Sequence, residues 1–209
     1  MKIYIAGKIT GDPDYRAKFA DAQRQIEAQG HIVLNPATLP EEWNVEKKIL
    51  DVTCGSRSIW FNKTHPAAVY CDKRNESYSG IWKSTKNDSE RQCVIAPDIQ
   101  CDFTCLPFSD DTFSLVVFDP PHLKDVSENS WMRKKYGALD DNWPQMLHDG
   151  FRECMRVLKP DGVLIFKWSE VAIPAAQVWA AIGEKPLFGH HSGKKMNTFW
   201  GCFMKLKED

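Results

Sequence analysis

Short apolar runs recur between residues 47 and 120, and acidic residues at their ends constrain the fold more than any other feature. The acids are Asp51, Asp72, Asp102 and Asp119. These runs predict buried strands at 49–52, 68–71 and 99–103, and the unbroken run at 113–118 is typical of a central parallel strand. The carboxyl ends of parallel strands meet at one edge of a sheet, where ligands bind. We therefore expect the four carboxylates to border one site.

Helical patterns alternate with these runs. Residues 143–158 place apolar side chains on one helix face, and a turn at 159–162 leads to a predicted strand at 163–166. A helix at 172–182 follows, and 187–188 with 199–204 suggest a closing antiparallel pair. The polar residues 73–92 predict a loop with a short helix, and 123–142 are also polar. This alternation predicts an α/β fold built on a parallel sheet.

The first 40 residues read as a separate β-α-β unit. Strands are predicted at 2–6 and 31–34, with a helix at 15–29 between them. Asn35-Pro36 and Leu39-Pro40 then interrupt the pattern. We divide the chain into an N-terminal segment, 1–44, and a main domain, 45–209.

Composition excludes several classes of protein. The formal net charge of −1 gives no global attraction to nucleic acid, so any basic surface must be local. The seven cysteines include no CxxC pair, which favours buried thiols of a reducing compartment over disulfides or a zinc site. We expect no metal. There is no signal peptide and no long apolar run, so we expect a cytoplasmic protein without membrane contact.

The first turn and the next two acids suggest a nucleoside site. Gly55, between the small residues Cys54 and Ser56, lets the backbone approach a ligand. Asp72 lies 17 residues later, near the spacing of an acid that binds ribose, although it would also suit a helix cap. Asp102 can accept from an adenine amino group with Phe103 against the ring, or be an ordinary loop acid. No phosphate cradle is evident, which favours a nucleoside over a dinucleotide.

Residues 47–205 resemble class I S-adenosylmethionine-dependent methyltransferases. The matching pieces are the first motif at 51–56, the acids Asp72 and Asp102, Leu106-Pro107-Phe108 before the run at 113–118, and Leu158-Lys159-Pro160-Asp161-Gly162. The resemblance implies a Rossmann-like sheet with helices on both faces and S-adenosylmethionine as cofactor. It places Asp51, Thr53, Cys54, Gly55, Ser56, Asp72, Asp102 and Phe103 around that cofactor. The first motif of this chain has a single glycine, and the Trp60-Phe61 pair after it suits a core position.

Asp119-Pro120-Pro121-His122 resembles the Asp/Asn-Pro-Pro-aromatic motif of methyltransferases that modify amino groups of bases. An aromatic amine is a poor nucleophile because its lone pair is delocalised into the ring. A carboxylate and a carbonyl that accept its N–H bonds favour a more pyramidal nitrogen, and rigid prolines hold that geometry. The motif implies that the fourth residue stacks on the base, and here this residue is His122. The favoured acceptor is adenine N6 in DNA, with the base flipped out of a duplex.

Two basic segments leave alternatives open. Residues 131–137 (Trp-Met-Arg-Lys-Lys-Tyr-Gly) suit a substrate-binding lid or a solvated loop equally. Residues 189–195 carry a His pair, which we interpret as part of a surface loop.

The N-terminal segment resembles the start of a nucleoside 2-deoxyribosyltransferase-like domain, which is common in phage proteins. The matching residues are 2–11 and 31–40. The part of that family with the catalytic acids has no counterpart, so we expect no glycosyl transfer.

Other functions remain open. Sequence-specific DNA methyltransferases usually carry an extra recognition module, and only two short loops are available here. The alternatives are methylation of RNA or a small molecule, and a non-catalytic protein that binds S-adenosylmethionine or a nucleotide.

Overall fold

A seven-stranded sheet forms the centre of the main domain. The computed structural model describes residues 2–4, 14–34, 47–82, 89–192 and 197–206. The sheet order is β10-β11-β9-β8-β3-β4-β7. Its parallel strands are β3 (Ile49–Asp51), β4 (Ala68–Asp72), β7 (Ile99–Gln100), β8 (Phe113–Phe118) and β9 (Leu158–Ser169).

An antiparallel pair closes the sheet beside β9, as predicted. This pair is β10 (Phe188–Ser192) and β11 (Thr198–Met204), and β11 runs antiparallel to both neighbours. Counted along the chain, the seven strands lie in the order 3-2-1-4-5-7-6. The order reverses between β3 and β8, which is where an open α/β sheet forms its ligand crevice. The Rossmann-like α/β sheet is therefore confirmed.

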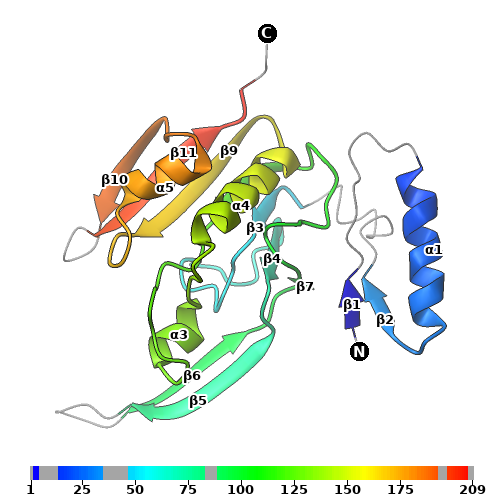
Figure 1. The fold of residues 1–209 in the computed structure, drawn as a ribbon, viewed down its shortest axis with the longest axis horizontal. Helices are drawn as coiled ribbons and strands as arrows, with labels where there is room; N and C mark the ends of the chain where they lie inside the picture. The colour runs from blue at the N-terminus through cyan, green and yellow to red at the C-terminus, as the bar shows by residue number, and fades with distance from the viewer. Residues whose placement is uncertain (1, 5–13, 35–46, 83–88, 193–196, 207–209) are drawn as a thin grey trace.

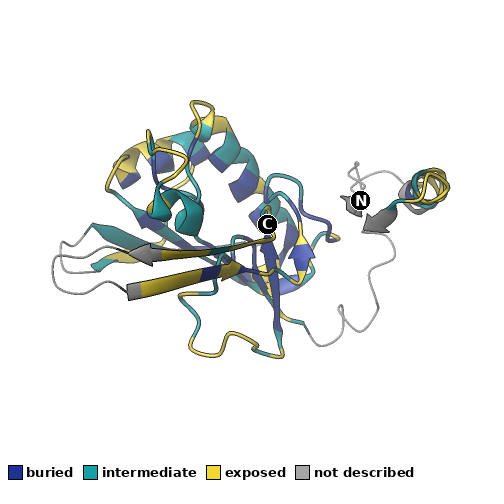
Figure 2. Ribbon diagram, turned by 90° about the horizontal axis from the view of Figure 1, so that it is seen from below, coloured by how far each residue is buried: buried dark blue, intermediate teal, exposed yellow. Residues whose placement is uncertain are grey.

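Two helices cover one face of this sheet (Figures 1 and 2). Helix α4 (Trp143–Val157) buries Leu147, Phe151, Cys154 and Val157, and α5 (Ala175–Ile182) packs beside it. The ring of Phe151 lies 5.0 Å from that of Phe203 on β11, and Trp179 of α5 lies 5.3 Å from Phe166 of β9. Aromatic packing thus makes up much of this core.

The opposite face of β3 and β4 is covered by turns rather than by a helix. Residues 52–67 form turns, and the ring of Trp60 packs edge-on against Tyr70 at 5.0 Å. The guanidinium of Arg57 lies 3.8 Å above the same Tyr70 ring. The prediction of a core position holds only for Trp60, because Phe61 is fully exposed. We predicted helices on both faces of the sheet, but among the described helices those that pack on the sheet lie on one face, and turns take their place on the other.

The segment between β4 and β7 is a hairpin, so the predicted loop with a short helix is wrong. Strand β5 (Glu76–Trp82) pairs antiparallel with β6 (Ser89–Ile95). In β6, Cys93 and Ile95 are buried whereas Gln92 and Val94 are exposed, which is the two-residue period of a strand. The many charged residues of this segment hid that period in the sequence.

Three smaller corrections concern element bounds. The third strand, predicted to reach residue 103, is only β7 because 101–103 turn away at Asp102. The polar segment 123–142 contains a short helix, α3 (Trp131–Tyr136). Residues 189–192, predicted as surface loop, belong to β10 because they pair with β11; 193–196 lie outside the described residues.

The predicted N-terminal β-α-β unit is present. It consists of β1 (Lys2–Tyr4), α1 (Tyr15–Glu27) and β2 (Ile32–Leu34), and β1 and β2 pair in parallel with each other. The predicted strand residues 5–6 and the boundary at 44 lie outside the described residues. Within the described ranges, no helix is long and apolar enough to span a membrane.

All seven cysteines are free thiols, and six of them are buried, as predicted.

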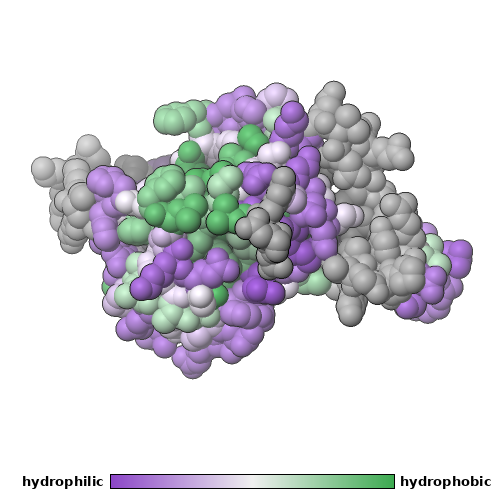
Figure 3. All heavy atoms as spheres, turned by 90° about the horizontal axis from the view of Figure 1, so that it is seen from above, coloured by the Kyte–Doolittle hydropathy of each residue, from purple (hydrophilic) through white to green (hydrophobic). Residues whose placement is uncertain are grey.

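Three exposed apolar side chains lie at the end of the sheet where β10 begins and β11 ends. Figure 3 shows apolar atoms concentrated on the face seen from above. Leu187, Phe188 and Leu206 are 59%, 70% and 63% exposed and lie at these strand ends. This end is opposite the carboxyl ends of the parallel strands.

We predict that Gly150→Ala destabilises the fold by about 1–3 kcal/mol, the usual cost of overpacking. A Cβ at position 150 would lie 2.4 Å from Cδ2 of Phe103, on the buried side of α4. Urea unfolding measures the loss. Gly80→Ala is the matched control, since a Cβ there meets nothing within 4 Å. Equal stabilities for the two variants would contradict the prediction.

Candidate active site

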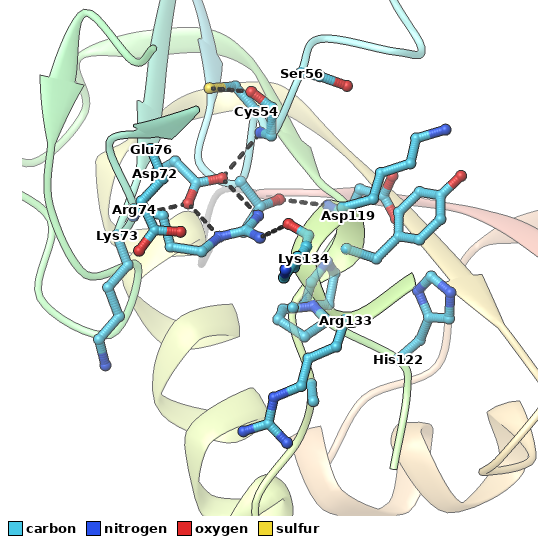
Figure 4. A pocket seen from close by; sticks show the side chains of 18 of the residues that line it. Cys54, Ser56, Asp72, Lys73, Arg74, Glu76, Asp119, His122, Arg133 and Lys134 are labelled. Atoms are coloured by element: carbon cyan, nitrogen blue, oxygen red, sulfur yellow. Dashed lines mark hydrogen bonds and ion pairs between the residues drawn. The ribbon is translucent and has the colours of Figure 1, made fainter. Parts of the chain in front are cut away.

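A cavity of about 390 Å³ opens at the carboxyl ends of the parallel strands. Its walls come from the turns after β3, β4, β7 and β8, from β5 and from α3 (Figure 4). It brings together eleven of the twelve predicted site residues: Thr53, Cys54, Gly55, Ser56, Asp72, Asp102, Phe103, Asp119, Pro120, Pro121 and His122. The prediction that the strand-end acids meet is therefore confirmed for three of four.

Asp51 is the exception, because its side chain lies beside Trp60, on the sheet face opposite α4. Its carboxylate is 1% exposed and accepts hydrogen bonds from Nε1 of Trp60 at 2.7 Å and from the amide of Thr53 at 3.1 Å. Burial raises the pKa of Asp51 to about 7, although these two hydrogen bonds act in the other direction. Asp51 thus shapes the first turn from behind and does not border the cavity.

Asp72 joins the first turn to the second. Its Oδ2 accepts from the amide of Gly55 at 2.9 Å, and its Oδ1 accepts from the amide of Arg74 at 2.9 Å and from Nε at 3.1 Å. The φ of Gly55 is +50°, a conformation that favours glycine. Arg74 also donates to the carbonyl of Lys134 on α3 at 3.1 Å, so it connects β4 to the far wall of the cavity. Sequence reasoning missed Arg74.

Asp102 is held at the third strand end. It accepts from the amide and hydroxyl of Thr104 at 3.0 and 2.8 Å, and Lys73 lies 2.9 Å from Oδ2. Partial burial alone would raise the pKa of Asp102, but these hydrogen bonds and the lysine lower it overall. Its neighbour Phe103 is buried, with its ring 5.1 Å from Phe118, so only part of it borders the cavity.

Two charged residues of α4 hold the turn that follows Asp102. The amide of Leu106 donates to Oε2 of Glu153 at 2.8 Å. Arg156 donates to the carbonyls of Leu106 and Phe108 at 3.0 and 2.7 Å and is paired with Glu153. Bonds from a charged group to backbone are among the stronger hydrogen bonds. The Leu-Pro-Phe run is therefore fixed against α4.

Asp119 stands at the end of β8 with a partner that sequence reasoning missed. Its amide donates to the hydroxyl of Thr53 at 2.9 Å, and its Oδ2 lies 2.6 Å from Nζ of Lys167. Both charged side chains are 17% exposed, so the pair is partly desolvated. Lys167 interrupts the apolar strand β9, and a lysine in such a strand needs a partner. That interruption was the available clue.

His122 lies in an aromatic corner of the cavity. Its ring is 5.6 Å from Tyr136 and 6.4 Å from Trp168. Burial lowers the pKa of His122 despite the opposing charge of Asp119, which favours a neutral, planar ring near pH 7. A neutral aromatic ring at the end of the Asp-Pro-Pro-His turn suits contact with another flat ring.

The basic segment 131–137, which follows the Asp-Pro-Pro-His turn, is a wall of the cavity rather than a loop directed only at solvent. Its residues from Arg133 to Gly137 line the cavity, the first four from α3. Gly137 has a φ of +75°, and a Cβ there would lie 3.2 Å from Cγ of Pro121. This close approach holds the helix end against the proline turn.

The His pair lies away from the cavity, on β10. Nε2 of His191 is 2.8 Å from Oε2 of Glu170. In the part of the chain that the structure describes, no three His, Cys, Asp or Glu side chains are grouped to hold a metal ion.

Comparison with known proteins gives similarities over both parts of the chain. A family model described as a domain of unknown function (DUF4406) matches residues 1–55. Its description names no activity, so the deoxyribosyltransferase-like interpretation of residues 1–44 stays a prediction. No curated protein matches the chain.

Several solved structures resemble it at low identity. A TehB-like SAM-dependent methyltransferase from Corynebacterium glutamicum is 13% identical, with 93% of this chain and 100% of that chain covered and a TM-score of 0.45. A SAM-dependent methyltransferase from Leishmania major is 12% identical over 92% and 74%, with a TM-score of 0.43. A protein from Pyrococcus horikoshii is 14% identical over 94% and 93%, with a TM-score of 0.45.

We predict that Asp51 makes stability fall as the pH rises. Its pKa is about 7 in the folded protein against an ordinary 3.8, so between these values the folded state holds a proton that the unfolded state has lost. This contribution is complete below the lower value and disappears as the pH rises toward 7, at about 1.4 kcal/mol per pH unit.

The check is urea unfolding across this pH range for the wild type and Asp51→Asn. The variant cannot ionise, so it should lack this slope and gain stability relative to the wild type with rising pH. Parallel stability curves would refute the assignment.

Proposed function

We propose that this protein is an S-adenosylmethionine-dependent methyltransferase that acts on an exocyclic amino nitrogen of a nucleobase, with adenine N6 in DNA preferred. One observation carries the proposal: the Asp-Pro-Pro-His turn borders the same cavity as the acids after β4 and β7. The strand order 3-2-1-4-5-7-6 agrees with the class I methyltransferase resemblance of residues 47–205.

The side chains around one half of the cavity fit a nucleoside cofactor. Oδ2 of Asp72 accepts from the Gly55 amide at 2.9 Å and, at a longer 3.4 Å, from Nη2 of Arg74, and a ribose hydroxyl would replace this longer contact. Asp102, its pKa lowered, is an acceptor for an adenine amino group, and Phe103 offers an apolar edge beside it. Bound there, S-adenosylmethionine would supply an electrophilic methyl group on its sulfonium.

The other half of the cavity fits the acceptor amine. Lys167 holds Oδ2 of Asp119 and the Thr53 hydroxyl holds its amide, so the carboxylate is oriented before substrate binds. Its Oδ1 is the acceptor for one amine N–H, and the carbonyl of Pro120 is the acceptor for the other. His122, with Tyr136 beside it, offers a flat surface for the base. Such pre-orientation lowers the barrier without further reorganisation.

Labelled methyl transfer tests the proposal. The wild type, incubated with S-adenosylmethionine carrying a labelled methyl group and a panel of unmethylated DNA, RNA and nucleotides, should yield labelled N6-methyladenine in DNA. Asp119→Ala should lose transfer by about 10²-fold or more, because the amine loses its oriented acceptor. Calorimetry should show that the variant still binds the cofactor.

Three results would count against this assignment. Normal methylation by Asp119→Ala would remove the catalytic turn from the reaction. Label on a small molecule or on RNA alone would support methyl transfer but show that DNA is not the acceptor. Cofactor binding with no label on any acceptor would favour a non-catalytic binding protein.

We predict that Lys167→Met lowers kcat by on the order of 10²-fold, since misplacement of a catalytic group by an ångström has that effect. Lys167 acts through Asp119, so cofactor affinity should stay unchanged. Lys167→Arg keeps the charge and should restore part of the activity. Full activity of the methionine variant would show that the ion pair is dispensable.

A further inference from the structure

A second hollow of about 820 Å³ adjoins the active cavity. It lies between the loop after β3, strand β6 and the start of α3, and we call it the hairpin groove. Four residues line both hollows: Gly55, Ser56, Ser58 and Lys135. A ligand that extends out of the active cavity past this shared wall would enter the hairpin groove.

Positive charge is concentrated in this groove. Lys63, Arg91 and Lys135 line it beside one acid, Glu90, and Arg57 also lines it but is paired with Asp98. The whole chain carries a formal net charge of −1, so this is a local excess. A basic stripe beside a base-sized cavity is what the negative backbone of a nucleic acid requires.

The groove is held in shape by Arg57. Its guanidinium donates to the carbonyl of Lys63 at 2.6 Å and to that of Ala96 at 2.9 Å, and it pairs with Asp98 at 3.0 Å. These bonds connect the loop after β3 to the end of β6. The side chain of Lys63, in contrast, is exposed and available to a ligand.

An aromatic side chain stands on the opposite wall. Trp131 begins α3 and lines the groove, and Lys135 follows four residues later on the same side of the helix. The hydroxyls of Ser56, Ser58 and Thr64 add hydrogen-bonding groups. Aromatic rings interleaved with basic residues bind single-stranded nucleic acid by base stacking and phosphate contact.

We propose that the hairpin groove binds a single strand of nucleic acid next to the base that occupies the active cavity. This inference rests on the proposed function, since it assigns the flanking part of that same substrate. Lys63, Arg91 and Lys135 face phosphates, and Trp131 stacks on a neighbouring base. The strand is held through its backbone and base faces, so binding depends little on sequence.

Fluorescence anisotropy of end-labelled single-stranded DNA and RNA, over a series of salt concentrations, tests the groove. Lys63→Ala should reduce the slope of log K against log salt by about 0.7, the value for one lost phosphate contact. Trp131→Ala should weaken binding about tenfold or more with little change of slope. Lys159→Ala is the matched control, because Lys159 is exposed near the amino end of β9 and does not line the groove.

Calorimetry of cofactor binding separates this inference from the proposed function, because neither groove variant should change that affinity. Strand binding that depends on Lys63 and Trp131, without methyl transfer, would support the groove and remove the proposed reaction. If methyl transfer occurs but Lys63→Ala and Trp131→Ala bind the strand as tightly as the Lys159→Ala control, strand binding in the groove is overturned and the proposed reaction stands. Equal turnover of a free nucleotide and a strand would also overturn it.

Discussion

The buried carboxylate of Asp51 supports the loop on which the rest of the site depends. No helix follows β3, so the chain from Val52 to Ala67 has no internal helical hydrogen bonds to fix it. Asp51 instead holds the Thr53 amide and the Trp60 indole. The hydroxyl of Thr53 then accepts a hydrogen bond from the amide of Asp119, and the buried carboxyl group of Asp51 is thereby linked through Thr53 to the Asp-Pro-Pro-His turn.

The cavity is assembled from pairs of opposite charge rather than from isolated acids. Asp72 is paired with Arg74, Asp102 with Lys73 and Asp119 with Lys167. Each carboxylate thus has an oriented partner in a partly enclosed space, where an unpaired carboxylate would be costly. Arg156 and Glu153 do the same for the backbone of the Leu-Pro-Phe turn, which they connect to α4.

Sequence patterns predicted the sheet and most of the cavity because buried parallel strands and their terminal acids are local features. They failed where the determinant is distant or masked. The hairpin β5–β6 was missed because exposed charges dominate its composition, although Cys93 and Ile95 alternate with exposed residues. Lys167 lies 48 residues from Asp119, and only the topology of β8 beside β9 brings them together. The sheet face on which the side chain of Asp51 lies depends on its register beside Tyr70 in β4, and the spacing of residues in the sequence does not give this register.

The hairpin has a consequence for how such a chain can diversify. Among the described strands, β5 and β6 pair only with each other and add no rung to the central sheet. An insertion, deletion or exchange of side chains along them therefore leaves the register of β4, β3 and β8 untouched. Exposed side chains of this projecting arm can therefore change at small cost to folding, whereas Cys93 and Ile95 stay buried and the turn at 119–122 keeps its place.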